Sequence, residues 1–267
     1  MINLLIEHTL FGSVDKVQIA IDLLKKYEPP EGYYLCFSGG KDSTVIYDLA
    51  IKAGVKFDAH HNITTVEPPQ LMRFIRDHYP DIVNEHPKKS MFQLIVERKI
   101  PPLRMARYCC AELKEIHGKD RFKLTGIRSE ESPRRAKRPQ LDKHNNGKSF
   151  FLHIIKDWSE QDVWQYIRDN NLPYCNLYDL GFKRIGCVLC PFQNYEQTQR
   201  DLELFPAIAD YYRRACRKSY EVHKSLLKKW QSGDDIFDWW INTRKGRYIA
   251  QDCNQIPLFS EDDGSIL

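Results

Sequence analysis

The sequence predicts an α/β protein with a doubly wound, mostly parallel sheet and a helical extension at its C-terminus. Three observations support this fold class. Short apolar runs alternate with helical patterns through residue 155, a glycine turn joins the first core run to a helix, and only helical periodicity follows residue 195. We expect one domain over residues 1–194 and the helical extension over residues 195–267.

The expected elements follow one another in the order that a parallel sheet requires. The strands are predicted at 33–37, 56–63, 122–127 and 150–155. A first helix, with Ser13 as its N-cap, carries apolar residues over 17–24. Further helices are predicted at 44–53, between Pro68-Pro69 and Pro80, and at 90–99, 159–169, 201–220, 222–231 and 235–242. In such sheets, ligands bind at the carboxyl ends of the strands, where the glycine turn is expected.

Composition excludes several classes of protein. The hydrophobic fraction of 42% and the charged fraction of 28% are ordinary for a globular domain. No apolar run is long enough to span a membrane, and the N-terminus lacks the features of a signal peptide, so we expect a cytoplasmic protein without a membrane partner. A net charge of +4 is too small to require nucleic acid, and eight cysteines are too sparse for a disulfide scaffold.

The glycine turn is the most informative segment. It comprises Ser38, Gly39, Gly40, Lys41, Asp42, Ser43 and Thr44, which together we call the phosphate cradle. Glycines let the backbone approach an anion, and the N–H groups and dipole of the new helix favour negative charge. Lysine and hydroxyl side chains add a mobile charge and hydrogen-bond donors. A plain glycine turn before a helix is the simple alternative, but strand, turn, lysine and helix together favour phosphate binding.

The order Ser-Gly-Gly-Lys-Asp-Ser resembles the S-G-G-x-D-S signature of the PP-loop ATP pyrophosphatases, which cleave ATP between its α and β phosphates. The resemblance implies an adenine nucleotide bound with Mg²⁺. It also implies catalytic roles for Lys41, which would neutralise the departing pyrophosphate, and for Asp42. That carboxylate either helps hold the Mg²⁺ or stabilises the helix N-terminus through its charge.

Four cysteines form two close pairs, Cys109-Cys110 and Cys187-x-x-Cys190. Such a set can close a tetrahedral zinc site or hold an iron–sulfur cluster. Adjacent cysteines suit the larger cluster better than a single ion, while the spacing leaves zinc open as the alternative. Buried free thiols are the simplest explanation of any cysteine. Of the other four cysteines, Cys36, Cys175 and Cys216 fit no ligand pattern, and we expect them to pack in the core.

Over residues 30–195 the chain resembles the phosphoadenosine phosphosulfate (PAPS) reductase family, and within it the cluster-bearing adenosine phosphosulfate (APS) reductases. The resemblance rests on separated motifs: the cradle, Thr64-Thr65-Val66-Glu67-Pro68-Pro69, Cys109-Cys110, the segment 125–134, and 158–164 continuing to Cys190. It implies an adenine nucleotide alpha hydrolase-like fold and a [4Fe–4S] cluster on Cys109, Cys110, Cys187 and Cys190. It further implies nucleotide contacts from Thr65, Gly126, Arg128 and Arg134, with Arg128 also catalytic.

Two departures separate the chain from the reductases. Their C-terminal Glu-Cys-Gly-Leu-His motif, which carries the nucleophilic cysteine, is replaced by Asp252-Cys253-Asn254. The neighbouring carboxylate would raise the pKa of Cys253, so we do not expect this thiol to be the nucleophile. The cradle, in contrast, is intact, and its lysine suits the extra charge of a triphosphate.

The sequence therefore predicts ATP-dependent adenylation coupled to sulfur transfer, with a nucleic acid or a sulfur-donor protein as partner. The alternatives are a reductase that makes sulfite from APS or PAPS, and an adenine-nucleotide sensor without turnover. Basic residues at Arg135, Lys137 and Arg138 suit a nucleic-acid backbone, an acidic protein, or only solvent. A homo-oligomer is among the expected assemblies.

Overall fold

The computed structural model describes residues 5–9, 12–143 and 149–245. The chain divides into two compact units. The first comprises residues 1–88 and 112–187, and the second comprises residues 89–111 and 188–267. Residues 89–111, in the middle of the chain, therefore belong to the same compact unit as the C-terminal helices. The division at residue 194, which was expected from the sequence, stays a prediction.

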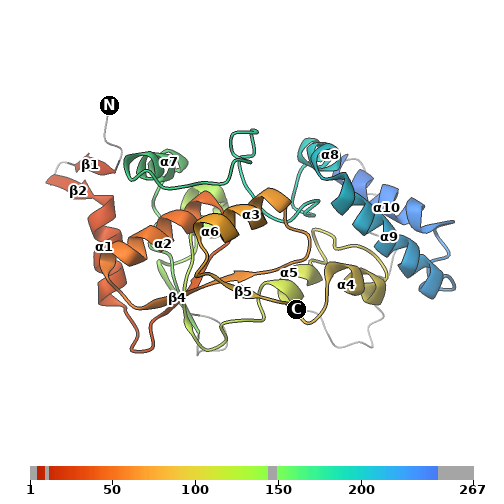
Figure 1. Cartoon of the computed structure of the whole chain (residues 1–267), viewed down its shortest axis with the longest axis horizontal. Coiled ribbons are helices and arrows are strands. Elements are labelled where there is room, and N and C mark those ends of the chain that lie inside the picture. The colour runs from red at the N-terminus through yellow and green to blue at the C-terminus, as the bar shows by residue number, and fades with distance from the viewer. Residues whose placement is uncertain (1–4, 10–11, 144–148, 246–267) are drawn as a thin grey trace. The chain divides into compact units, whose positions relative to one another are not determined.

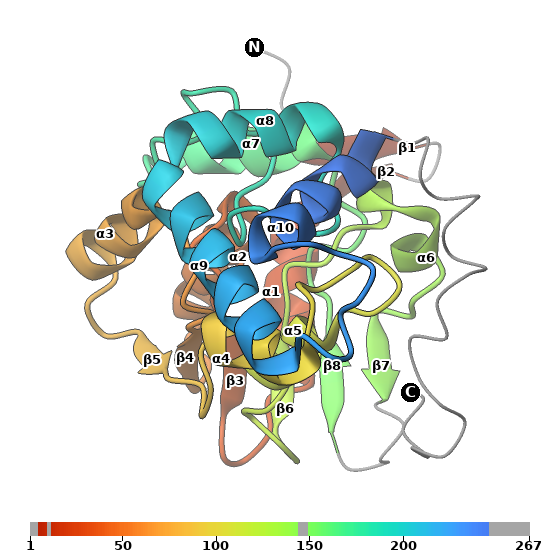
Figure 2. The ribbon, with the colours of Figure 1, turned by 90° about the vertical axis from the view of Figure 1, so that its right-hand side faces the viewer.

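The first unit is built on a six-stranded sheet in the order β5-β4-β3-β6-β8-β7, several strands of which are seen side by side in Figure 2. Its strands are β3 (Tyr33–Cys36), β4 (Phe57–Asn62), β5 (Val83–Glu85), β6 (Phe122–Leu124), β7 (Leu141–Lys143) and β8 (Phe150–Leu152). Neighbouring strands are parallel except for the pair β7 and β8. A separate hairpin pairs β1 (Ile6–Thr9) with β2 (Gly12–Asp15). The predicted α/β class with a mostly parallel sheet is confirmed.

The first unit also contains helices, several of which bury apolar residues (Figure 1). They are α1 (Lys16–Lys26), α2 (Lys41–Ala53), α3 (Pro69–His78), α6 (Pro133–Ala136) and α7 (Glu160–Asp169), with the short 3-10 turn η1 (Ser129–Glu131). In β3, Leu35 is fully buried, as expected for a central strand of a parallel sheet. Helix α2 contributes the buried Val45, Ile46 and Leu49.

The strand order creates a switch point between β3 and β6. From β3 the chain adds β4 and then β5 on one side, whereas β6 and β8 lie on the other side of β3. The loops that leave β3 and β6 therefore diverge at their carboxyl ends, which is where open α/β sheets bind ligands. The phosphate cradle is the loop after β3.

The second unit is helical in its described residues. It contains α4 (Met91–Arg98), α8 (Tyr195–Leu204), α9 (Pro206–His223), α10 (Gly233–Asn242) and the 3-10 turn η2 (Thr243–Lys245), while α5 (Tyr108–Leu113) crosses the boundary between the units. Helix α9 packs against both α4 and α10. The rings of Tyr212 and Trp240 are buried, with centroids 4.9 Å apart. The C-terminal helical extension is confirmed.

Three local predictions were wrong, each for a physical reason. The N-cap of α1 is Asp15, whose carboxylate accepts from two backbone N–H groups, while Ser13 lies in β2. Pro206 begins a new helix and so splits the expected helix 201–220 into α8 and α9. The predicted helix 222–231 is absent from the described structure, because α9 ends at His223 and the chain then turns.

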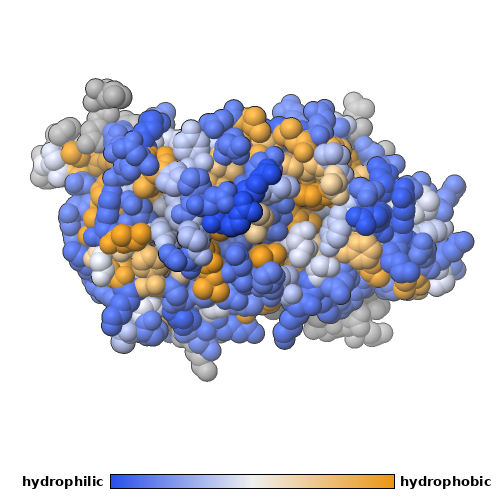
Figure 3. All heavy atoms as spheres, in the orientation of Figure 1, coloured by the Kyte–Doolittle hydropathy of each residue, from blue (hydrophilic) through white to orange (hydrophobic). Residues whose placement is uncertain are grey.

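Within the described residues, no helix is both long and apolar enough to cross a membrane. On the face drawn in Figure 3, hydrophilic side chains predominate and hydrophobic ones gather in small groups.

His153, just after β8, is fully buried. Its Nδ1 lies 2.6 Å from Thr125 Oγ1, and its buried Nε2 has no hydrogen-bond partner among the described residues. Burial, followed by the charge of Arg138, lowers the pKa of His153 from 6.5 to about 4, against the opposing charge of Asp142. The imidazole is therefore neutral in the folded chain.

We predict that His153 makes folding stability depend on pH. Because its pKa is depressed in the folded state, its stabilising contribution is complete above pH 6.5 and is lost as the pH falls towards 4. The loss amounts to about 3 kcal/mol. Urea unfolding at a series of pH values should show a shallower decline for His153→Asn, which keeps a polar group near Thr125. Parallel declines in both proteins would contradict the prediction.

Candidate functional site

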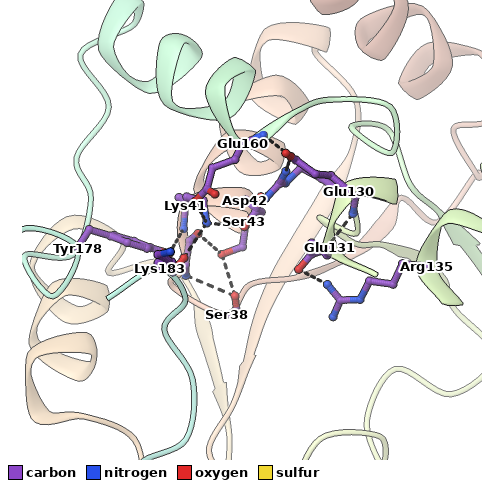
Figure 4. Close-up of polar contacts among 12 residues, drawn as sticks. Ser38, Lys41, Asp42, Ser43, Glu130, Glu131, Arg135, Glu160, Tyr178 and Lys183 are labelled. Atoms are coloured by element: carbon purple, nitrogen blue, oxygen red, sulfur yellow. Dashed lines mark hydrogen bonds and ion pairs between the residues drawn. The ribbon is translucent and has the colours of Figure 1, made fainter. Parts of the chain in front are cut away.

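The phosphate cradle leads directly from β3 into α2. The Ser43 hydroxyl donates to the Gly40 carbonyl at 2.8 Å, and the Ser38 and Ser43 hydroxyls are 3.2 Å apart (Figure 4). Thr44 is buried, and its N–H donates to the Gly40 carbonyl as the first helical hydrogen bond. Gly40 supplies no side-chain cap, so the first N–H groups of α2 have no acceptor within the helix and bond to groups from elsewhere. Such a helix start is suited to binding an anion.

Lys41 is 4% exposed and is surrounded by acceptors. Its ammonium donates to the Lys183 carbonyl at 3.2 Å and lies 3.3 Å from the Glu160 carboxylate, which comes from the start of α7. Asp42 is also close, at 3.7 Å. Figure 4 shows these groups gathered around the start of α2. The lysine is thus held at the cradle by one carbonyl and two carboxylates.

Tyr178 contacts both the backbone N–H and the ammonium of Lys41. Its hydroxyl accepts the Lys41 N–H at 2.9 Å, and its ring centroid lies 5.3 Å from the Lys41 ammonium. Burial raises the pKa of Tyr178, so the phenol stays protonated. Trp164 of α7 packs edge-on against the ring at 5.0 Å and fixes its position. The tyrosine oxygen therefore accepts from the Lys41 N–H, a donor for which a bound phosphate oxygen would compete.

Asp42 and Arg128 join the two loops at the switch point. Arg128, 4% exposed, donates from Nε to Asp42 Oδ1 at 2.6 Å and from Nη1 to Glu130 Oε2 at 2.8 Å. Burial alone would lower the pKa of Arg128, but the charge of Asp42, its hydrogen bond and the neighbouring glutamates raise it. The guanidinium is a permanent cation beside the cradle. Both residues predicted to be catalytic thus lie together with Lys41.

Two glycines allow the close packing of this region. Gly39 has φ +72°, a backbone region that favours glycine, and a Cβ there would lie 2.5 Å from Leu71 Cδ1. Gly126, after β6, has no room for a side chain because a Cβ would lie 3.0 Å from the backbone of Asp42. The role of Gly126 in the structure is therefore to let the β6 loop approach α2.

The segment after β4 connects the site to a cysteine. Thr65 has φ +66°, and the Thr64 N–H donates to the Glu67 carboxylate. The hydroxyl of Thr64 lies 3.3 Å from Cys187 Sγ. Within the first unit, the Thr-Thr motif and Cys187 are therefore in direct contact.

The basic segment is partly neutralised by acidic residues. Arg135 pairs with Glu131, and Arg138 pairs with Asp142 at 3.7 Å. Arg134, predicted to contact the nucleotide, is exposed on α6. These pairs reduce the cationic surface available to a nucleic acid, although Arg134 and Lys137 remain exposed.

The predicted metal ligands are divided between the two units. Cys109 and Cys110 lie on α5 and, with Cys190, belong to the second unit, whereas Cys187 ends the first. Cys109 is buried, and the other three are partly accessible. Among the described residues, no group of three or more His, Cys, Asp or Glu side chains is arranged to hold a metal ion. The ligand set stays a prediction, and Cys253 lies outside the described residues.

The structure adds three residues that the sequence analysis did not single out as site residues: Tyr178, Glu160 and the carbonyl of Lys183. Each belongs to a segment far from the cradle in sequence, and Tyr178 is 137 positions from Lys41. Glu160 belongs to the motif 158–164, and its negative charge at the start of a predicted helix is the sequence signal that could have marked it as a site residue.

The fold and this site define an α/β protein with a mostly parallel sheet and a glycine turn at its switch point. A model described as the phosphoadenosine phosphosulfate reductase domain matches residues 32–193. An uncharacterized protein of Methanocaldococcus jannaschii is 29% identical over 203 residues, which are 71% of this chain and 42% of that protein. The adenosine 5′-phosphosulfate reductase of Lysinibacillus sphaericus is 30% identical over 177 residues, covering 59% of this chain and 72% of that enzyme.

Among solved structures, the phosphoadenylyl-sulfate (PAPS) reductase of Candida auris, a phosphate complex, has a TM-score of 0.51 at 20% identity. The match covers 64% of this chain and 87% of that one and shows a shared fold. The chain spans less than half the length of the Methanocaldococcus relative. On the domain match, the protein belongs to the phosphoadenosine phosphosulfate reductase domain family, whose relatives include enzymes.

On the expectation that the cradle binds ATP, we predict that Tyr178→Phe strengthens this binding. The substitution removes the oxygen that competes for the Lys41 N–H while keeping the ring against Trp164. A neutral hydrogen bond has a net value of about 1 kcal/mol, so the dissociation constant should fall about fivefold. Calorimetric titration measures the change, with Tyr174→Phe as the control because its hydroxyl bonds only to exposed Asp179 among the described contacts. Weaker binding in Tyr178→Phe would contradict this interpretation.

Proposed function

We propose that this protein binds ATP at the phosphate cradle and cleaves it between the α and β phosphates, transferring the adenylyl group to an acceptor before sulfur transfer. The observation that carries this proposal is the intact cradle with its lysine. Lys41, Asp42 and Arg128 are assembled at the start of α2, at the switch point of a parallel sheet. A permanent cation, a mobile cation and a helix N-terminus together suit a highly charged polyphosphate.

The proposed reaction uses these groups for positioning and charge stabilisation. An acceptor oxygen attacks the α phosphorus, the bond from that phosphorus to the bridging oxygen breaks, and pyrophosphate leaves with the electron pair. Lys41 would exchange the Lys183 carbonyl and Glu160 for the leaving phosphate oxygens. Arg128 would hold Asp42 in place across the switch point. Catalysis of this kind relies on preorganised charge rather than on a covalent intermediate.

The site can also provide a ligand for Mg²⁺. Asp42 Oδ1 accepts from Arg128, whereas Oδ2 has only the more distant Lys41 as an ion-pair partner among the described residues. One carboxylate oxygen is a suitable contribution, since Mg²⁺ in nucleotide enzymes takes most of its remaining ligands from phosphates and water. When bound, the ion would neutralise phosphate charge.

A sulfonucleotide reductase is the second candidate. It is favoured by the 30% identity to a protein named adenosine 5′-phosphosulfate reductase. The same cradle could hold the phosphate of APS or PAPS, and the acceptor of electrons would then be the sulfate group. The intact lysine at the start of α2 favours the triphosphate.

We further propose that Cys109, Cys110, Cys187 and Cys190 hold a [4Fe–4S] cluster, with zinc as the alternative. Four thiols are the donor set that either group prefers. Contact between Cys187 and Thr64 would connect this group to the segment after β4. A bound cluster would supply redox or sulfur chemistry, and the proposal assigns it no step.

Lys41→Met is predicted to lower the rate of ATP turnover to AMP and pyrophosphate at least about 100-fold, because the leaving phosphate loses its mobile cation. Lys52→Met is the matched control, since Lys52 belongs to the same helix but pairs with Asp48. Products are separated by anion-exchange chromatography with Mg²⁺ present. Release of ADP and phosphate would contradict the proposed bond cleavage. Sulfite release from APS or PAPS with thioredoxin would instead establish the reductase.

Each of Cys109→Ser, Cys110→Ser, Cys187→Ser and Cys190→Ser is predicted to lose the bound metal. Anaerobic purification followed by iron, sulfide and zinc analysis measures this, with Cys175→Ala as the control because Cys175 lies outside the set. One equivalent of zinc without iron would show that the four cysteines hold zinc rather than a cluster. Full metal retention in all four variants would refute the ligand set.

A further inference from the structure

The second unit carries a basic segment whose charges are not neutralised by carboxylates of the same chain. Residues 98–111 include no acidic residue and four basic ones: Arg98, Lys99, Arg104 and Arg107. Arg104 and Arg107 are both exposed, and in the part of the chain that the structure describes their side chains contact Phe192 and no carboxylate. The basic segment of the first unit differs, since two of its arginines form ion pairs with acidic residues. Cations without such partners are available to an anion from outside the chain.

An exposed aromatic ring lies beside these two cations. Phe192 is 46% exposed, and its carbonyl accepts from Arg104 Nη2 at 3.1 Å. The guanidinium carbons of Arg104 and Arg107 lie 5.9 and 5.7 Å from the Phe192 ring centroid. Met105, between the two arginines in sequence, is 92% exposed. We call these four residues the arginine–phenylalanine patch. Arginine, methionine and aromatic side chains are enriched in binding surfaces relative to the rest of a protein surface.

The loop that carries the two arginines is held in place within the second unit. Trp240 Nε1 of α10 donates to the Pro102 carbonyl at 2.8 Å, and both residues are buried. The Leu103 N–H donates to the Ala106 carbonyl at 3.1 Å, which closes the short turn between these two residues. A loop fixed in this way loses little conformational entropy when it binds a partner.

The segment that carries Phe192 is fixed by the C-terminal helices. The Leu189 N–H donates to Asp201 Oδ2 of α8 at 2.8 Å, and the Leu189 carbonyl accepts from Arg244 Nη2 of η2 at 2.8 Å. Asp201, 1% exposed, also accepts from Gln193 Nε2 at 2.8 Å. Residues on both sides of Phe192 are therefore bound to the same buried carboxylate, so the exposed ring projects from a fixed backbone.

A single-stranded nucleic acid has the chemistry that this combination of groups can bind. Each nucleotide offers a flat base that stacks on an aromatic ring and a phosphate that pairs with a guanidinium. A duplex keeps its base faces inside the stack, where a ring on a protein surface does not reach them. An acidic peptide would pair with the cations, but it has no use for an exposed ring between them. The ring and the two cations together therefore favour the single strand.

We propose that the arginine–phenylalanine patch of the second unit binds single-stranded nucleic acid. One base would stack on Phe192, and neighbouring phosphates would pair with Arg104 and Arg107. A surface of this kind holds a strand without reading its base sequence, because every base has a face that can stack. The inference goes beyond the proposed ATP chemistry, uses none of its residues and requires no metal.

The stacking contact is tested by fluorescence anisotropy of the full chain with labelled, mixed-sequence oligonucleotides of about 15 nucleotides, one of DNA and one of RNA. Phe192→Leu keeps an apolar side chain but removes the ring, and it should weaken binding at least about fivefold. Leu226→Ala is the control, since Leu226 is 65% exposed in the same unit but lies outside the patch. Binding of either strand supports the proposal, and the ratio of the two affinities shows which sugar the surface prefers.

The phosphate contact is tested by the salt dependence of the same binding. Arg107→Gln should reduce the slope of log affinity against log salt by about 0.7, as expected when one phosphate contact to a single strand is lost. The Arg107 side chain makes no hydrogen bond among the described contacts, so the substitution leaves the fold intact. Arg214→Gln should keep the wild-type slope, because Arg214 is exposed on α9 but pairs with Asp210 at 2.9 Å.

Folded wild-type protein that binds neither strand would overturn the proposal. Unchanged affinity in Phe192→Leu, or an unchanged salt slope in Arg107→Gln, would also overturn it. Duplex DNA bound as tightly as the single strands would exclude the stacking role, and binding of poly-glutamate in place of both strands would indicate an acidic protein partner instead. Conversion of ATP to AMP and pyrophosphate, measured on the same samples, shows separately whether the proposed ATP chemistry holds.

Discussion

The ion pair between the buried Arg128 and the partly exposed Asp42 is the interaction on which the site depends. It joins the loop after β6 to the first turn of α2, across the switch point of the sheet. Charge-assisted hydrogen bonds of this length are strong, and loss of Asp42 would leave the buried Arg128 guanidinium without one of its counter-charges. The pair therefore fixes the cradle and keeps a carboxylate and two cations together at the start of α2. Gly126 makes the approach possible because any side chain there would meet the Asp42 backbone.

Much of the fold of the first unit could be predicted from local sequence patterns. The alternation of strands and helices, the glycine turn after β3 and the apolar central strand follow from periodicity and from the conformational freedom of glycine. Those signals correctly placed the strands of the sheet's centre and the start of α7 at Ser159. They failed where one local signal competed with another, as at Ser13 and Asp15, or where a helix ended without glycine or proline, as at His223.

The contacts that shape the candidate site were beyond local inference. Tyr178 reaches Lys41 from a segment 137 residues away, and Arg244 reaches Leu189 from 55 residues away. Neither residue carries a periodicity or spacing that marks it, since their roles come from tertiary packing alone. The cysteine spacing, in contrast, is visible in the sequence, but the contacts of Val188 and Leu189 with the C-terminal helices are not. The first unit thus carries a cradle that the sequence predicts, whereas the helical contacts of Leu189 within the second unit are seen only in the fold.

Calorimetric titration of the wild-type chain with ATP, APS and PAPS, each with Mg²⁺, tests the central claim most directly, because binding requires no knowledge of the acceptor. The account predicts the tightest binding for ATP, since the cradle's cations meet the largest number of phosphate charges. Well-folded protein that releases no heat with any of the three nucleotides would contradict it.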